Sequence, residues 1–279
     1  ILLLVYFPSK LVYRTPYLLV NELKMSVNIY TIPCLQDNYA YILHDKSSKK
    51  TTLVDAPEFD PILSFLNDRD WKLDNILITH HHWDHIAAVK ELVTEFNPVV
   101  FGAKADIDRL PKLDVVLEDK DKFSVSNVII KCLEVPGHTI GHLAFYSPTM
   151  KILFSGDSLM ALGCGRLFEG SAEDMLSSLD KICKLPDDTM IYSGHEYANQ
   201  NAKFALSIEP QNLKLRNRAN QISKNNDKSY PNVPVILSTE KETNPFLRSD
   251  KLEIKRLPLF SDKTRLEIFT ALRQMKDNF

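Results

Sequence analysis

The sequence is poor in cysteine and has no excess of positive charge. Its 279 residues include four cysteines, which lie far apart and form no CxxC pair: Cys34, Cys132, Cys164 and Cys183. This spacing excludes a structural zinc knuckle and is typical of a reduced, intracellular protein. Lysine and arginine number 34 against 36 aspartates and glutamates, a formal net charge of −2. No global basic field therefore predicts nucleic acid as the main partner.

The chain also lacks an apolar run of the ~20 residues that a membrane-spanning helix needs, which predicts a protein with no membrane partner. Pro8 and Pro16 interrupt the apolar N-terminal stretch. We expect residues 1–25 to be an N-terminal extension, either untranslated, with translation starting at Met25, or an organellar targeting segment. The expected location is cytoplasmic, or mitochondrial if the targeting segment is genuine.

Hydrophobic periodicity divides the rest of the chain into a β-rich α/β domain, residues 26–195, and a helical domain, residues 196–279. Strands are expected at 27–33, 38–45, 50–57, 75–79, 98–103, 122–138, 143–148, 151–157 and 189–195. Helices are expected at 60–66, 86–96, 171–186, 198–209, 211–226 and 262–276. Ser171 and Asp174 resemble a capping box, and Ser261 is the expected cap of the last helix. A proline-rich connection, residues 229–246, precedes that helix.

The stretch ITHHHWDHIAA, residues 78–88, concentrates four histidines and one aspartate directly after an apolar run. In an extended chain, residues i and i+2 point to the same side and i+1 points away. His80 and His82 are therefore expected to bind one metal ion while His81 faces elsewhere. Asp84 and His85 come where the chain turns towards a helix, and we expect them to serve a second metal ion.

Three more candidate ligands follow apolar strands, each directly after a glycine: His138, Asp157 and His195. Functional sites in α/β proteins gather at strand ends, so these residues form a coherent set with the histidine-rich stretch. Nitrogen and oxygen donors without thiolate suit zinc, and also iron or manganese. His44 has no assigned role, and His142 fits either a partner that orients a ligand or a core histidine.

The motifs THHHWDH, PGHTIGH, FSGDSL and YSGHEY, in this order, resemble the metal-binding signature of the metallo-β-lactamase superfamily. Further segments resemble the glyoxalase II (hydroxyacylglutathione hydrolase) family: LQDNYAYIL, LVDAP, GCGRLFEG, YSGHEYANQNAKFA, TNPFLR and LRQMKDNF. The resemblance runs from Val27 to Phe279. It implies an α/β fold, the αββα sandwich of the metallo-β-lactamases with its site at one edge. It also implies a C-terminal all-helical domain that covers the substrate.

The resemblance implies two divalent metal ions per chain, most simply zinc, held by seven residues: His80, His82 and His138 for one ion, Asp84, His85 and His195 for the other, and Asp157 as the bridge. It also implies five positions that hold the glutathione part of a substrate: Arg166, Phe168, Tyr197, Arg273 and Lys276. Some family members have a tyrosine at the position of Phe168, so a hydroxyl contact is missing there. Arg273 and Lys276 are three residues apart on an expected helix and therefore share one face, where they can pair with a carboxylate of glutathione.

The implied reaction is hydrolysis of the thioester S-(D)-lactoylglutathione to D-lactate and glutathione by a metal-bound hydroxide. Two metal ions ~3.5–4 Å apart can share one water and lower its pKa towards ~7. A thiol, with an ordinary pKa near ~8.5, can leave as thiolate, so no dedicated general acid is required. We expect a monomer that acts on this small-molecule substrate.

Several other functions compete with this interpretation. A persulfide dioxygenase of the same superfamily uses one iron, but those relatives lack the long helical extension with its terminal RxxK pattern. A β-lactamase is normally exported, and a tRNA-processing nuclease needs a basic arm that the charge balance does not support. A non-catalytic, metal-stabilised binding protein is the alternative from another class. Loss of lactoylglutathione absorbance on adding the protein, with metal analysis of the same sample, discriminates among these functions.

Overall fold

A computed structural model describes residues 3–5, 12–14, 26–228 and 230–279. The chain divides into two compact units, Ile1–Leu133 with Phe145–Met150, and Glu134–Ala144 with Lys151–Phe279. Apart from two short strands, the expected N-terminal extension, residues 1–25, lies outside the described residues. Among the described residues, no helix has the length and apolar content needed to cross a bilayer.

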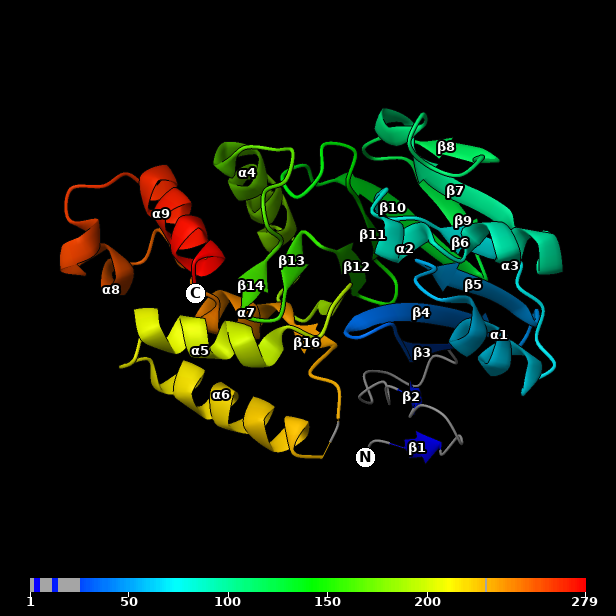
Figure 1. Cartoon of the computed structure of the whole chain (residues 1–279), viewed down its shortest axis with the longest axis horizontal. Helices are drawn as coiled ribbons and strands as arrows, with labels where there is room; N and C mark the ends of the chain where they lie inside the picture. The colour runs from blue at the N-terminus through cyan, green and yellow to red at the C-terminus, as the bar shows by residue number, and fades with distance from the viewer. Residues whose placement is uncertain (1–2, 6–11, 15–25, 229) are drawn as a thin grey trace. The chain divides into compact units, whose positions relative to one another are not determined.

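The first unit contains an eight-stranded sheet whose strands follow one another in chain order (Figure 1). Its strands are β1 (Leu3–Val5), β2 (Val12–Arg14), β3 (Val27–Cys34), β4 (Asn38–Asp45), β5 (Lys50–Val54), β6 (Asn75–Leu77), β7 (Val99–Ala103) and β8 (Val115–Leu117). The pairings from β1 to β5 are antiparallel, and those from β5 to β8 are parallel. Parallel strands end at one edge, so the loops after β5, β6 and β7 gather there.

Helices α1 (Phe59–Asn67) and α3 (Val89–Phe96) cover one face of this sheet, and α2 (Trp83–Ile86) and a 3₁₀ turn (Lys104–Asp106) complete the unit's helices among the described residues. Alternate residues of β3, such as Tyr30 and Ile32, point into a buried apolar cluster, as the two-residue period of a strand requires. Phe65 of α1 and Leu92 of α3 fill the same cluster. The loops after β5, β6 and β7 are therefore connected to a tightly packed core.

The expected strand 122–138 is a hairpin in the structure, formed by β9 (Lys122–Val125) and β10 (Val128–Glu134). Ser126 and Asn127 both have positive φ, 47° and 58°, which is the backbone of a two-residue hairpin turn that follows the twist of its strands. Strand β11 (Leu143–Ser147) follows β10 in the order of that sheet. Sequence periodicity alone did not reveal this turn, because the apolar pattern continues through it.

The second unit contains β12 (Ile152–Gly156), β15 (Met190–Ser193) and β16 (Val235–Ile236), which are neighbours in that order, and a small pair, β13 (Leu159–Met160) with β14 (Gly163–Cys164). Its helices are α4 (Ala172–Cys183), α5 (Ala198–Ile208), α6 (Leu213–Asn226), α7 (Leu237–Thr243), α8 (Leu252–Lys255), a 3₁₀ turn (Pro258–Phe260) and α9 (Arg265–Asp277). Helices α5 and α6 run side by side (Figure 1). The buried ring of Phe246 packs against those of Phe204 from α5 and Phe269 from α9.

Most expected elements are confirmed, including the capping box of α4, in which Ser171 and Asp174 bond reciprocally. The cap expected at Ser261 is wrong, because α9 begins at Arg265 and Thr264 forms the capping box with Glu267. The connection expected at 229–246 contains α7. The prolines on both sides of this helix made the sequence predict a connection there.

The helix expected at 86–96 is two helices, α2 and α3, separated at Ala87 and Ala88. The backbone N–H of Ala88 donates to the carbonyl of Ala56 at 2.9 Å, so it makes no bond within the helix. The N–H of Ala56 in turn donates to the carbonyl of His85 at 2.8 Å. This reciprocal pair fixes the loop after β5 against the segment that carries Asp84 and His85.

Candidate metal centre

The histidine-rich segment begins where β6 ends. His80 and His85 are fully buried, and His82 has an extended backbone, with φ −60° and ψ 142°, directly before α2. Asp84 and His85 lie in the single turn of α2. The segment therefore changes from extended chain to helix within its own length, as the sequence predicted.

Asp55, at the end of β5, fixes the ring of His85. Its carboxylate accepts hydrogen bonds from the backbone N–H of Thr79 at 2.8 Å, the hydroxyl of Thr79 at 2.8 Å and Nδ1 of His85 at 2.9 Å. Because an ionised carboxylate only accepts hydrogen bonds, Nδ1 of His85 carries the proton. The lone pair of this imidazole is therefore on Nε2, the atom needed to bind a metal ion.

The same chain of bonds sets the tautomer of His80. The Thr79 hydroxyl donates to Asp55, so its oxygen accepts from Nδ1 of His80, 3.0 Å away. The lone pair of His80 is then on Nε2, which lies 3.1 Å from Nδ1 of His82. Two imidazole nitrogens at this distance are positioned to share an ion.

His81 points to different partners. Its Nδ1 lies 2.8 Å from Oδ2 of the buried Asp106, and its Nε2 lies 3.3 Å from Nη1 of Arg109. Arginine only donates, so Nε2 accepts and Nδ1 carries the proton. Both ring nitrogens are thus engaged away from His80 and His82, which is the direction that the two-residue period of extended chain predicted.

In the second unit, Asp157 lies between His138 and His195. Its Oδ2 is 3.4 Å from Nε2 of His138 and 3.2 Å from Nε2 of His195, and all three side chains are buried. Nδ1 of His138 donates to the backbone carbonyl of Arg166 at 2.7 Å, which leaves its lone pair on Nε2. One carboxylate oxygen therefore faces two imidazoles, the placement expected of a bridging ligand.

His142 holds the backbone of Asp157, since its Nε2 accepts the N–H of Asp157 at 3.0 Å. Of the two interpretations that the sequence left open, the structure favours a partner that orients a ligand. His44 bonds to Thr51 at 3.0 Å and stacks on Trp71 with ring centroids 3.5 Å apart. Burial lowers the pKa of His44, so this histidine is a neutral part of the scaffold.

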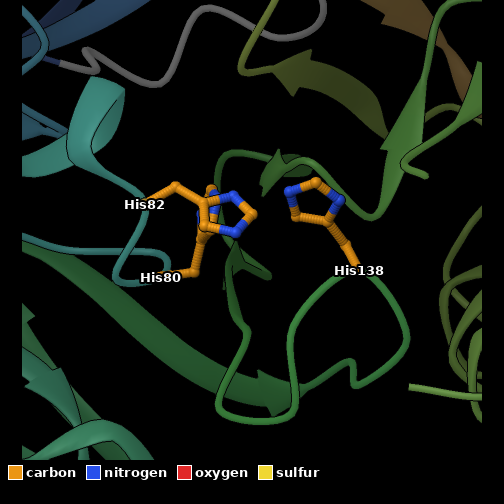
Figure 2. A group of neighbouring side chains, drawn as sticks. All are labelled: His80, His82 and His138. Atoms are coloured by element: carbon orange, nitrogen blue, oxygen red, sulfur yellow. The ribbon is translucent and has the colours of Figure 1, made fainter. Parts of the chain in front are cut away.

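Three groups of side chains each place one ligand atom per residue within 4.8 Å of the others: His80, His82 and His138; His80, His85 and Asp157; and Asp84, His85 and His195. Figure 2 shows the first group, with the imidazoles of His80 and His82 facing that of His138. All seven predicted ligands occur in these groups.

The donor set fits a divalent metal ion. Two ligands ~2.1 Å from a tetrahedral zinc ion lie roughly 3.4 Å apart. The distances from His80 Nε2 to His82 Nδ1, from His195 Nε2 to Asp157 Oδ2 and from His138 Nε2 to Asp157 Oδ2 are 3.1, 3.2 and 3.4 Å, which agree with that separation. The histidines whose tautomer is fixed by a partner, His80, His85 and His138, all present an unprotonated nitrogen. Imidazole and carboxylate ligands of this kind bind divalent metals.

Two of the predicted substrate residues are aromatic and lie against the ligands. The ring of Tyr197 stacks on His195 with centroids 4.7 Å apart and an interplanar angle of 7°. The ring of Phe168 meets His138 edge-on at 5.3 Å. Tyr197 is 38% exposed and Phe168 is 62% exposed, so both offer apolar surface beside the ligands.

The predicted basic residues lie at the end of α9. Arg273 is only 6% exposed; its Nη1 donates to the carbonyl of Cys164 at 2.7 Å, and its Nη2 lies 3.0 Å from Oδ1 of Asp277. Nε of the exposed Arg166 reaches the same oxygen at 3.2 Å. Burial and the neighbouring arginines lower the pKa of Lys276. Burial also raises the pKa of the Cys164 thiol, which agrees with a packing role for this cysteine.

Two family models together match residues 36–279. Residues 36–195 match the metallo-beta-lactamase superfamily, and residues 196–279 match the hydroxyacylglutathione hydrolase C-terminus. A hydroxyacylglutathione hydrolase of Ruegeria pomeroyi is 48% identical over 255 residues, which cover 91% of this chain and 100% of the relative. The chain belongs to the hydroxyacylglutathione hydrolase family. A second relative of that name, from Cereibacter sphaeroides, is 47% identical with the same coverage.

Solved structures show that this member of the hydroxyacylglutathione hydrolase family has the metallo-β-lactamase fold. The B3 metallo-beta-lactamase BLEG-1 superposes with a TM-score of 0.61 and 21% identity, over 78% of this chain and 99% of that one. ETHE1 from Myxococcus xanthus superposes with a TM-score of 0.60 and 22% identity, over 85% of each chain. The fold class expected from the sequence is thus confirmed.

Sequence reasoning missed three residues that contact the candidate site residues. Asp55 orients His85, Asn38 donates to the Asp84 carboxylate at 3.0 Å, and Asp277 joins two arginines. Asp55 stands in the LVDAP motif and, like Asp157, follows a strand, so the strand-end argument would have found it. Asn38 and Asp277 stand in the LQDNYAYIL and LRQMKDNF motifs, but neither of them directly follows a strand.

Proposed function

We propose that this chain hydrolyses S-(D)-lactoylglutathione to D-lactate and glutathione. The observation that carries the proposal is the position of Asp157 Oδ2, at ligand distance from Nε2 of both His138 and His195. Membership of the hydroxyacylglutathione hydrolase family supplies the class of thioester. Family and site together favour hydrolysis over a merely structural metal.

The proposed centre holds two divalent ions, with zinc as the first choice and iron or manganese as the alternatives. His80, His82 and His138 would hold one ion, Asp84, His85 and His195 the other, and Asp157 both. When bound, such ions supply an activated water near neutral pH and a Lewis acid that polarises a carbonyl.

The chain's own residues prepare this centre by placing protons. Asp55 and Thr79 keep protons on Nδ1 of His85 and His80, and the carbonyl of Arg166 does the same for His138. The nitrogens that would bind the metal ions are therefore already unprotonated before an ion binds. His142 fixes the backbone from which the proposed bridging carboxylate of Asp157 extends.

The substrate contacts are proposed for residues 196–279 together with the loop after β14, while residues 26–195 carry the catalytic centre. Tyr197 and Phe168 offer apolar surface next to the reacting thioester, and Arg166, Arg273 and Lys276 offer positive charge to the carboxylates of glutathione. The thiol of glutathione leaves as thiolate, so no residue is assigned as general acid.

We further propose a monomer that works in the cytoplasm, or in mitochondria if residues 1–24 are a targeting segment. None of the four cysteines forms a disulfide within the described residues, and three of them are buried, which agrees with a reducing compartment.

The test is hydrolysis of lactoylglutathione, followed through loss of the thioester absorbance, with metal analysis of the same preparation purified without chelator. We expect turnover and about two metal ions per chain. Full activity with one metal ion per chain would contradict the two-metal centre. No turnover of the thioester, combined with oxygen uptake on glutathione persulfide, would instead identify a persulfide dioxygenase.

A further inference from the structure

Asp277, the last residue of α9, lies where two of the proposed substrate-binding cations meet. Its Oδ1 is 3.2 Å from Nε of Arg166 and 3.0 Å from Nη2 of Arg273. Nη2 of Arg166 also lies 3.5 Å from the backbone carbonyl of Asp277. One carboxylate oxygen thus receives two guanidinium groups, one from the loop after β14 and one from the last turn of α9.

The two arginines differ in how firmly they are held. Arg273 is buried, and its Nη1 donates to the carbonyl of Cys164 at 2.7 Å, so its guanidinium has a fixed position. Arg166 is exposed and has many rotamers open to it in solvent. Asp277 joins the exposed guanidinium of Arg166 to the buried one of Arg273, and Arg166 thereby acquires a defined place.

The charges around Asp277 call for such a residue. Arg166, Arg273 and Lys276 are like charges, and both arginines lower the pKa of Lys276 whereas Asp277 raises it. Without this carboxylate the three cations would repel one another, and the exposed Arg166 would be the first to move away. The cluster keeps a net positive charge even with Asp277 ionised, so it can still attract an anion.

We propose that Asp277 is a positioning residue for substrate binding, which holds Arg166 beside Arg273 as a pair that receives a carboxylate of the glutathione moiety. This inference rests on the proposed function, because it takes the glutathione thioester as the substrate. Asp277 acts through the arginines at the far end of the substrate from the reacting carbonyl. Its removal should therefore weaken binding and leave the chemical step unchanged.

The test compares Asp277→Ala and Asp277→Asn with wild type, and uses Asp227→Asn as the control. Asp227 is an exposed aspartate at the end of α6, and so a matched position without the arginines. We expect KM for lactoylglutathione to rise about tenfold in Asp277→Ala, which is ~1.4 kcal/mol. In Asp277→Asn, which keeps an acceptor oxygen but loses the charge, we expect a rise of about threefold. In both, kcat should stay within about twofold of wild type.

Measuring KM in an enzyme that already carries Arg166→Ala shows whether Asp277 acts through Arg166. In an Arg166→Ala enzyme, adding Asp277→Asn should change KM by less than about twofold, because the side chain that it positions is gone. An additive rise would overturn the proposal, and so would a fall in KM, which would mean that Asp277 competes with the substrate for the arginines. A loss confined to kcat would also overturn it. If Asp277→Ala does not fold by circular dichroism, Asp277→Asn decides, since it keeps both volume and acceptor.

Failure of this inference is distinguishable from failure of the proposed function. A wild-type enzyme that does not hydrolyse lactoylglutathione contradicts the function, whereas an active wild type with unaffected Asp277 variants contradicts only the inference. Calorimetric titration with S-methylglutathione, a thioether that cannot be hydrolysed, measures binding without turnover. The proposal expects weaker binding to both Asp277 variants than to wild type and Asp227→Asn, and equal binding would refute it.

Discussion

Replacing Asp55 by asparagine should weaken metal binding without removing any ligand. Asp55 is buried and accepts three hydrogen bonds, from the N–H and hydroxyl of Thr79 and from Nδ1 of His85. An asparagine has one acceptor oxygen, and its NH₂ group only donates. In either orientation of the amide, at least one of the three donors would face another donor.

The size of the effect follows from those contacts. A buried donor left without an acceptor costs about 1–3 kcal/mol of stability. Loss of a partner that orients a metal-binding histidine typically costs ~10–100-fold in metal affinity or activity. Asn also suits the backbone, because Asp55 has φ +56° and asparagine tolerates the left-handed region well. The substitution therefore tests the hydrogen bonds of Asp55 and adds little backbone strain.

The assay is metal retention during titration with a chelator, together with kcat measured at limiting and at saturating metal. Asp70→Asn is the control, since Asp70 is exposed and also has a left-handed backbone, with φ 52°. We expect Asp55→Asn to lose its metal at a chelator concentration about 10–100-fold lower than wild type needs. We also expect part of its kcat to return when metal is in excess. Metal retention equal to that of wild type would refute the reasoning that Asp55 sets the His85 tautomer. Equal losses in both variants would mean that the effect is not specific to Asp55.

Three further outcomes are expected. His82→Ala should lose metal and most thioester hydrolysis, whereas His81→Ala should keep near wild-type metal content by elemental analysis. The reverse result would mean that His81, and not His82, is the ligand. Lys276→Ala should raise KM for lactoylglutathione several-fold with little change in kcat in steady-state kinetics, because it removes a charge remote from the reacting carbonyl. Thr264→Ala should lower the free energy of unfolding by ~1 kcal/mol in denaturant titrations, while Ser261→Ala, which caps no α-helix, should change it much less.

The sequence predicted the parts of the site that depend on local geometry. The two-residue period separates His81 from His80 and His82, and in the structure His81 bonds to Asp106 instead. The strand-end rule holds for Asp157, which directly follows β12, whereas His138 comes four residues after β10 ends at Glu134. A glycine is required at 137, where φ is 144° and an added Cβ would lie 2.7 Å from the Met175 Cβ. Both rules act within a few residues, so one sequence contains all the information that they need.

The parts that were missed depend on residues far apart in the chain or on competition between local signals. The strand-end pattern marks Asp55 as a candidate, but no short pattern encodes its pairing with His85 or that of Asp277 with Arg166, since only folding brings these residues together. The start of α9 is a different case. Thr264 is followed three residues later by Glu267, a full capping box, and this rule would have decided against Ser261.

What faces the unprotonated ring nitrogen separates a metal centre from a chance gathering of histidines. His81 is half-buried and carries its proton on Nδ1, which faces Asp106, but its Nε2 accepts from Arg109. His80, His85 and His138 also bond outwards through Nδ1, to a hydroxyl, a carboxylate and a carbonyl respectively. Their three partners are chemically unrelated, yet all leave Nε2 unprotonated. Nε2 of His80 lies 3.1 Å from Nδ1 of His82, Nε2 of His138 lies 3.4 Å from Oδ2 of Asp157, and Nε2 of His85 lies 3.9 Å from Oδ2 of Asp84. Substitutions of the outer partners should therefore change metal affinity while the set of ligands stays complete.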